Sequence, residues 1–184
     1  GPDSSWAKAN RDDAELQKRA QELRETTLRN YVLLNHQTAQ NSRSAVAQKT
    51  AREGYEVYLN TFQKNEKYAE MRFFYGELLY DLKMYDAATS QYEWVAEHSG
   101  KENKYYEQAV LNTVLAAERN LPTEEEVRKK IGDSVAPVPY GDAEKRFFSA
   151  SDRYLKVFPN GEKVPDIRFK IGRIAYTYSH FDEA

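Results

Sequence analysis

The sequence has no cysteine, only 8 glycines and 6 prolines, and almost no excess charge. Without cysteine there is no disulfide, no thiolate metal site and no cysteine nucleophile. The 27 Lys and Arg side chains nearly balance the 29 Asp and Glu side chains. Because phosphate-binding surfaces need clustered Lys and Arg, this balance argues against nucleic acid as a partner. No apolar run approaches the ~20 residues that cross a bilayer, so we expect a soluble chain without direct membrane insertion.

Motifs for catalysis and for cofactor binding are missing as well. The three histidines, His36, His98 and His180, are far apart and lack HExxH spacing, so we expect surface or helix-end histidines and no metal site. No GxGxxG, GxSxG or complete phosphate loop occurs. The acidic run Glu124–Glu126 is typical of a helix start. We therefore expect no cofactor and no enzymatic activity, with a hydrolase or transferase as the weaker alternative.

An internal repeat is the strongest signal that the sequence does contain. Shifting the chain by 96 residues aligns 58–88 with 154–184 without a gap, and far more residues are identical than the roughly two expected by chance. A finer unit places a small residue four positions before a tyrosine. The identical pairs include Tyr58/Tyr154, Phe62/Phe158, Arg72/Arg168, Phe73/Phe169, Gly76/Gly172, Tyr80/Tyr176 and Ala88/Ala184, and the finer unit pairs Gly54 with Tyr58, Ala88 with Tyr92 and Ala150 with Tyr154.

Apolar residues recur with helical spacing, and strand alternation is absent. The spacing predicts helices at about 13–39, 43–63, 68–82, 85–98, 103–120, 142–158 and 164–179. Between them, Thr123 and Glu126 form a capping box for a short helix that Gly132 ends, and Pro137 and Pro139 favour an extended segment. The chain then divides into 1–42, with the apparent tag remnant Gly1-Pro2 and a long helix, the repeats 43–120, an insertion 121–141, and the truncated repeats 142–184.

The repeated units resemble tetratricopeptide repeats, a family of 34-residue helix-turn-helix units. The family places a small residue in the first helix, another twelve positions later and an aromatic four further on. Gly76, Ala88 and Tyr92 fit this spacing, and Gly172 and Ala184 fit it as far as the chain runs. The frequent tryptophan of the first helix is replaced by Arg72 and Arg168. The resemblance implies an all-α fold, a right-handed α-solenoid of antiparallel helical hairpins with about three and a half repeats.

The same resemblance implies a function in protein binding. First helices of this family line a concave groove, and the groove positions fall on Glu70, Phe73, Glu77, Tyr80, Asp166, Phe169, Arg173 and Tyr176. We therefore expect a scaffold that binds a protein or peptide through aromatic side chains rimmed by charge. The alternative is that these aromatics recur because helix stacking needs them. The repeats look most like those of bacterial cell-envelope proteins, which implies a periplasmic or outer-membrane-associated location, with a cytoplasmic one as the alternative.

The two end helices carry apolar stripes that bear on self-association. Leu16, Ala20, Leu23, Thr27, Tyr31 and Leu34 follow heptad-like intervals, and we expect them to cap the open end of the array, with a coiled-coil dimer as the alternative. The helix at 164–179 carries Ile167, Ile171, Ile174, Ala175 and Tyr178 on one side. Phe181–Ala184 reads as the first turn of a further helix. We expect the natural chain to continue with more repeats, and the uncovered strip to favour self-association through this end. A self-assembling structural subunit is thus the second function hypothesis.

Overall fold

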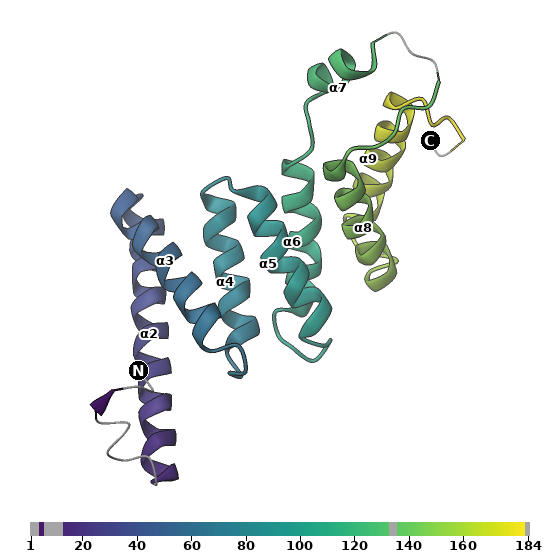
Figure 1. Ribbon diagram of the computed structural model, residues 1–184. Helices are drawn as coiled ribbons and strands as arrows, with labels where there is room; N and C mark the ends of the chain where they lie inside the picture. Colours follow the sequence, from purple (N-terminus) through teal and green to yellow (C-terminus); the bar gives the residue numbers. More distant parts are fainter. Residues whose placement is uncertain (1–3, 6–12, 133–135, 183–184) are drawn as a thin grey trace. The chain divides into compact units, whose positions relative to one another are not determined.

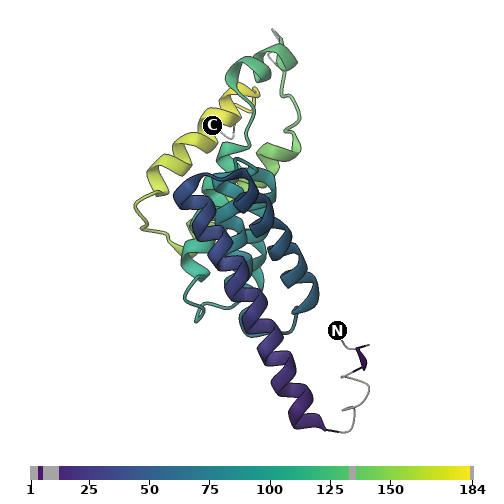
Figure 2. The same cartoon turned by 90° about the vertical axis from the view of Figure 1, so that its left-hand side faces the viewer.

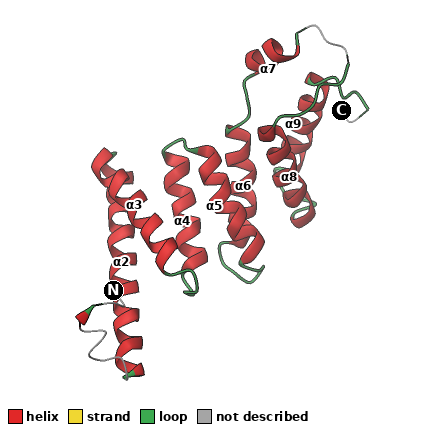
Figure 3. Ribbon diagram, in the orientation of Figure 1, coloured by secondary structure: helices red, strands yellow, loops and turns green. Residues whose placement is uncertain are grey.

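The structure is a computed structural model that describes residues 4–5, 13–132 and 136–182. These residues form eight α-helices joined by loops and turns, and no strand occurs among them (Figure 3). Every predicted helix is present, with ends that differ by only a few residues. No helix of this part of the chain is long and apolar enough to cross a bilayer. The helices are α2 (Ala14–Ser42), α3 (Ala45–Thr61), α4 (Tyr68–Asp81), α5 (Tyr85–His98), α6 (Tyr106–Arg119), α7 (Glu124–Ile131), α8 (Asp142–Val157) and α9 (Val164–Thr177).

The chain divides into two compact units, residues 1–78 and 79–184. In the first unit, α2 lies along α3, as both ribbon views show (Figures 1 and 2). In the second unit, α5 packs on α6, α6 on α8, and α8 on α9. Helix α4 begins in the first unit and ends in the second. The helices therefore pack mostly with their neighbours in sequence, as short polar links between antiparallel helices require.

Side-chain caps fix where several helices begin. The Asp13 carboxylate accepts a hydrogen bond from the Leu16 amide at the start of α2, and the Ser44 hydroxyl accepts one from the Ala47 amide at the start of α3. The predicted capping box of α7 is confirmed: Thr123 Oγ1 accepts from the Glu126 amide, and the Glu126 carboxylate accepts from the Thr123 amide. These bonds satisfy amide groups that have no partner within the helix.

A close approach of α2 and α3 forms the core of the first unit. Gly54 faces Val32 so closely that a Cβ at position 54 would lie 2.5 Å from Val32 Cγ2. Val32, Ala51 and Tyr55 are fully buried around this contact. The small residue at position 54 therefore lets α2 and α3 approach closely.

The apolar stripe of α2 faces the opposite way from the prediction. The side chains that α2 buries are Glu25, Val32, His36 and Ala39, whereas Leu23, Tyr31 and Leu34 are exposed. The expectation that this stripe caps the array was wrong because α2 has two faces with apolar residues and α3 covers only one. The expectation of a surface histidine was also wrong for His36, which is buried and lies 2.8 Å from the Tyr55 hydroxyl through its Nδ1.

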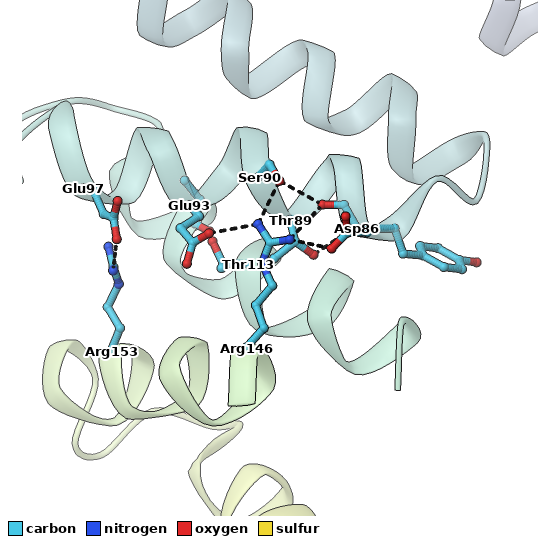
Figure 4. A network of polar contacts seen from close by, with 10 residues as sticks. Asp86, Thr89, Ser90, Glu93, Glu97, Thr113, Arg146 and Arg153 are labelled. Carbon is cyan, nitrogen blue, oxygen red and sulfur yellow. Dashed lines mark hydrogen bonds and ion pairs between the residues drawn. The ribbon is translucent and has the colours of Figure 1, made fainter. Parts of the chain in front are cut away.

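Polar contacts hold α8 against α5 in the second unit (Figure 4). Arg146 of α8 donates to the Asp86 carboxylate at 2.5 Å, to Ser90 Oγ at 2.8 Å and to the Glu93 carboxylate at 2.9 Å. Further along the same helix, Arg153 donates to the Glu97 carboxylate. Because the Arg146 side chain is only one quarter exposed, these ion pairs are less screened than those of a fully exposed surface.

Candidate functional site

Helix α9 presents one exposed row of predicted binding residues. Asp166, Phe169, Arg173 and Tyr176 follow one another at intervals of three and four, and all four side chains are exposed. The exposed fraction is 71% for Phe169 and 67% for Tyr176. The ring of Phe181 meets Tyr176 edge-on at 5.7 Å, and it is exposed as well. We call these three rings, two on α9 and Phe181 in the turn after it, the α9 aromatic face; exposed apolar side chains gathered in this way make a candidate surface for a protein contact.

The other side of α9 is buried, which corrects the expected open strip. Ile167, Ile174, Ala175 and Tyr178 are all buried. Leu121, Pro122 and Val127 of the insertion border Ile174, and the Tyr140 ring contacts Tyr178 at 5.3 Å. These described residues of the insertion therefore cover part of the strip, whose remaining member, Ile171, is half-buried. Phe181 and Asp182 form a turn, and the rest of the predicted further helix lies outside the described residues.

The predicted binding residues of α4 are less accessible than those of α9. Phe73 is only 6% exposed, and Glu70, Glu77 and Tyr80 are half-buried. The Tyr80 ring meets Tyr85 edge-on at 5.2 Å. Glu70, Phe73 and Glu77 belong to the first unit, and Tyr80 belongs to the second together with the α9 residues. Of the eight predicted residues, the structure thus brings Asp166, Phe169, Arg173 and Tyr176 onto one open surface.

A small pocket of about 50 Å³ lies beside this surface, between α7 and α9. Leu121, Pro122, Val127 and Ile174 form its apolar lining. Two ion pairs stand at its edge: Arg173 with Glu124 at 3.3 Å, and Lys170 with Glu118 at 3.2 Å. The pocket therefore combines apolar walls with a charged rim, which suits a single side chain of a partner better than a metabolite.

A buried carboxylate forms the boundary between this pocket and a larger cavity of about 570 Å³. Glu144, in the first turn of α8, is 3% exposed and lines both. The Tyr178 hydroxyl donates a hydrogen bond of 2.5 Å to Glu144 Oε1. Burial raises the pKa of Tyr178 well above its ordinary value, and the hydrogen bond and charge of Glu144 raise it further.

The first unit contains another buried tyrosine–glutamate hydrogen bond, and there an arginine also binds the glutamate. The Tyr58 hydroxyl donates to Glu25 Oε1 at 2.6 Å, and Arg29 Nε donates to the same oxygen at 2.8 Å. Burial alone would raise the pKa of Glu25, but the hydrogen bonds from Tyr58 and Arg29 and the charge of Arg29 outweigh it and lower this pKa below its usual value. The partners are 33 residues apart here and 34 residues apart for Glu144 and Tyr178.

Sequence reasoning missed Glu144 and both cavities. The available signal was the recurrence of a glutamate about one repeat before a tyrosine, as in Glu25 with Tyr58 and Glu144 with Tyr178.

The histidines lie apart, as expected: His98 stacks on Trp94, and His180 Nε2 is 2.9 Å from the Val138 carbonyl oxygen. Within 13–132 and 136–182, no group of three His, Asp or Glu side chains is arranged to hold a metal ion.

The sequence matches neither a protein-family model nor a curated protein. The function must therefore be argued from the two surfaces described above, namely the α9 aromatic face and the cavities beside Glu144. Both lie in the second unit.

Proposed function

We propose that this protein is a non-enzymatic scaffold that binds another protein or peptide through the α9 aromatic face. The observation that carries the proposal is the exposure of Phe169 and Tyr176 on one helix face, with Asp166 and Arg173 in the same row. Rigid aromatic rings flanked by charged groups are the side chains that most often dominate protein interfaces. Exposing them to water without a partner has no stabilising effect on the fold.

The architecture we propose is a right-handed solenoid of tetratricopeptide-like hairpins. The all-helical packing of mostly sequential neighbours supports it, as does the buried small residue at positions 54, 88 and 150, four before a buried tyrosine. On the same resemblance we propose a location in the bacterial cell envelope. Phe73 is not part of the proposed contact surface because its ring is buried.

The test uses two matched pairs of exposed apolar side chains. The double variant Phe169→Ala/Tyr176→Ala removes the two rings of the α9 aromatic face that lie on the helix itself, and Leu23→Ala/Leu34→Ala removes two exposed apolar side chains from α2. Partners captured from envelope extract by the wild type are purified and titrated against all three proteins. Loss of two interface aromatics weakens binding by about 2 kcal/mol or more, which is roughly thirtyfold. An unchanged affinity for the α9 variant, with circular dichroism showing an intact fold, would refute the proposal.

Self-assembly through α2 is the second candidate function. The specific observation in its favour is the row of exposed Leu23, Tyr31 and Leu34 on the face of α2 that α3 does not cover. Light scattering across a concentration series distinguishes the two functions. Self-assembly predicts a mass that rises with concentration in the wild type and in the α9 variant, but not in Leu23→Ala/Leu34→Ala. A constant monomer mass in all three proteins excludes it.

A further inference from the structure

The two buried tyrosine–glutamate pairs differ in one respect. Glu25 has a neutral donor, Tyr58, and a cation, Arg29, which is four residues later on the same helix. Glu144 has the neutral donor Tyr178, but the residue four positions later is Phe148. No Lys or Arg in the described parts of the chain forms an ion pair with Glu144. The second pair therefore has the same kind of tyrosine donor as the first but no cation paired with its carboxylate.

A buried carboxylate without a cation is costly, because a single neutral hydrogen bond does not replace the lost hydration. The position of Glu144 in the first turn of α8 offsets part of this cost through the helix dipole. Two basic side chains, Arg119 and Lys130, line the cavity beside the pair, and Lys130 Nζ lies 5.7 Å from the centre of the Tyr178 ring. Neither of them forms an ion pair with Glu144.

The space beside Glu144 is large enough for a side chain to enter. The cavity of about 570 Å³ is bounded by the end of α6, by α7 and by the start of α8, and Glu144 and Tyr178 line it together. Its lining also includes Glu126 and Asp142. Glu126 is occupied by the capping box with Thr123, and Asp142 lies 4.0 Å from Lys145. Glu144 is thus the buried anionic group that an entering cation would meet.

We propose that Glu144 and Tyr178 form a subsite that binds a basic side chain, arginine above all, of the protein partner. The bound guanidinium takes the place that Arg29 holds beside Glu25, with its N–H groups donating to the Glu144 carboxylate. Arginine is favoured over lysine because its planar fork can donate to both carboxylate oxygens and can stack on an aromatic ring. This subsite rests on the proposed function, since it supposes that the partner is a protein that docks on the second unit.

The subsite can be tested without knowing the partner. The probe is N-acetyl-L-argininamide, titrated into the isotope-labelled full chain while amide chemical shifts are recorded by NMR. N-acetyl-L-citrullinamide is the control probe, because it has nearly the same shape without the charge. We expect argininamide to shift the amides of Gly141–Lys145 and Tyr178 with a dissociation constant on the order of millimolar, as a ligand of this size allows. Citrullinamide should bind at least about tenfold more weakly.

Two variants show whether Glu144 is responsible. Glu144→Gln keeps the side-chain shape and an acceptor for the Tyr178 hydroxyl, and it should weaken argininamide binding at least about tenfold. Glu125→Gln removes an exposed carboxylate of α7 that lines neither cavity, and it should change binding less than twofold. Phe148→Arg supplies the missing cation from within the chain and should also abolish probe binding. Melting curves of all variants confirm that the fold is retained.

The outcomes separate this inference from the proposed function. Equal binding of the two probes, or argininamide binding that survives Glu144→Gln in a folded protein, would overturn the subsite. Absence of shifts around Gly141–Lys145 at saturating probe would overturn it as well. The Phe169→Ala/Tyr176→Ala variant should bind argininamide as the wild type does, because these side chains do not line the cavity. Failure of the α9 aromatic face therefore appears only in partner binding, and failure of the subsite appears in the probe titration.

Discussion

The contact between Gly54 and Val32 gives a quantitative test of how the first unit is packed. A methyl group at position 54 would lie 2.5 Å from Val32 Cγ2, which is closer than real carbon atoms approach. Val32 is fully buried, so it has little room to move. Overpacking of this kind costs about 1 to 3 kcal/mol. Alanine is a better helix former than glycine by about 1 kcal/mol, so Gly54→Ala should destabilise the unit by about 0 to 2 kcal/mol.

The double-mutant cycle makes the prediction sharper than either change alone. Val32→Ala removes two methyl groups, which are worth about 1.6 kcal/mol of transfer free energy. It also leaves a small cavity, so the total loss in free energy of unfolding should be about 2 to 3 kcal/mol. In the double variant the methyl group introduced at position 54 enters that cavity and the clash is absent. The changes in free energy of unfolding should therefore be non-additive by about 1 to 3 kcal/mol, and the double variant should be more stable than the sum of the two single changes predicts.

Urea unfolding followed by circular dichroism gives the free energy of unfolding of the wild type, the two single variants and the double variant. Additivity within about 0.5 kcal/mol would show that residues 32 and 54 do not compete for the same space. A Gly54→Ala variant that is stabilised by the full propensity gain of about 1 kcal/mol would refute the close approach itself. Either result would remove the packing reason for a small residue at this position.

Two further predictions concern polar contacts. Arg146→Met keeps the aliphatic stem but loses the polar contacts with α5, so it should lower the free energy of unfolding of the second unit by about 1 to 3 kcal/mol in urea titrations. The loss should be smaller in 1 M salt, because salt screens ion pairs. Lys156→Met, which removes an exposed ion pair, is the control and should lower this free energy by less than about 0.5 kcal/mol. The lowered pKa of Glu25 means that its stabilising effect is complete above the unfolded pKa and is lost as the pH falls through the folded value. The stability difference between wild type and Glu25→Gln should therefore shrink in urea titrations as the pH falls below the unfolded-state pKa of glutamate, about 4.3, and a constant difference would contradict the assignment.

Helix positions were predictable because their signals are local. The capping box of Thr123 and Glu126 and the 3–4 spacing of apolar residues in α4 depend on residues within one or two turns. Which face of a helix becomes buried depends on a partner far away in sequence. In α2, both the stripe through Leu23 and Leu34 and the face through Val32 and Ala39 look suitable, and only the position of α3 decides between them.

Repetition in the sequence predicts equivalent helix positions but not equivalent exposure. Phe73 and Phe169 are identical residues at the 96-residue offset, yet the first is buried and the second is largely exposed. Exposure is set in part by residues outside the repeated segment: Leu121, Pro122 and Val127 border Ile174, and the Tyr140 ring contacts Tyr178. The spacing of the groove positions could therefore indicate a row on α9, but it could not indicate which aromatic rings would be open to a partner.

The two tyrosine–glutamate pairs differ in what surrounds the carboxylate. Arg29 forms an ion pair with Glu25 from within the same helix, so that carboxylate already has a cation beside it. Phe148 cannot do the same for Glu144, and its ring contacts Tyr140 at 4.8 Å instead. The insertion that carries Tyr140 also builds the wall of the cavity beside Glu144. The Glu144 pair thus differs from the Glu25 pair in two respects, the aromatic ring four residues after the glutamate and the inserted segment that lines the neighbouring cavity.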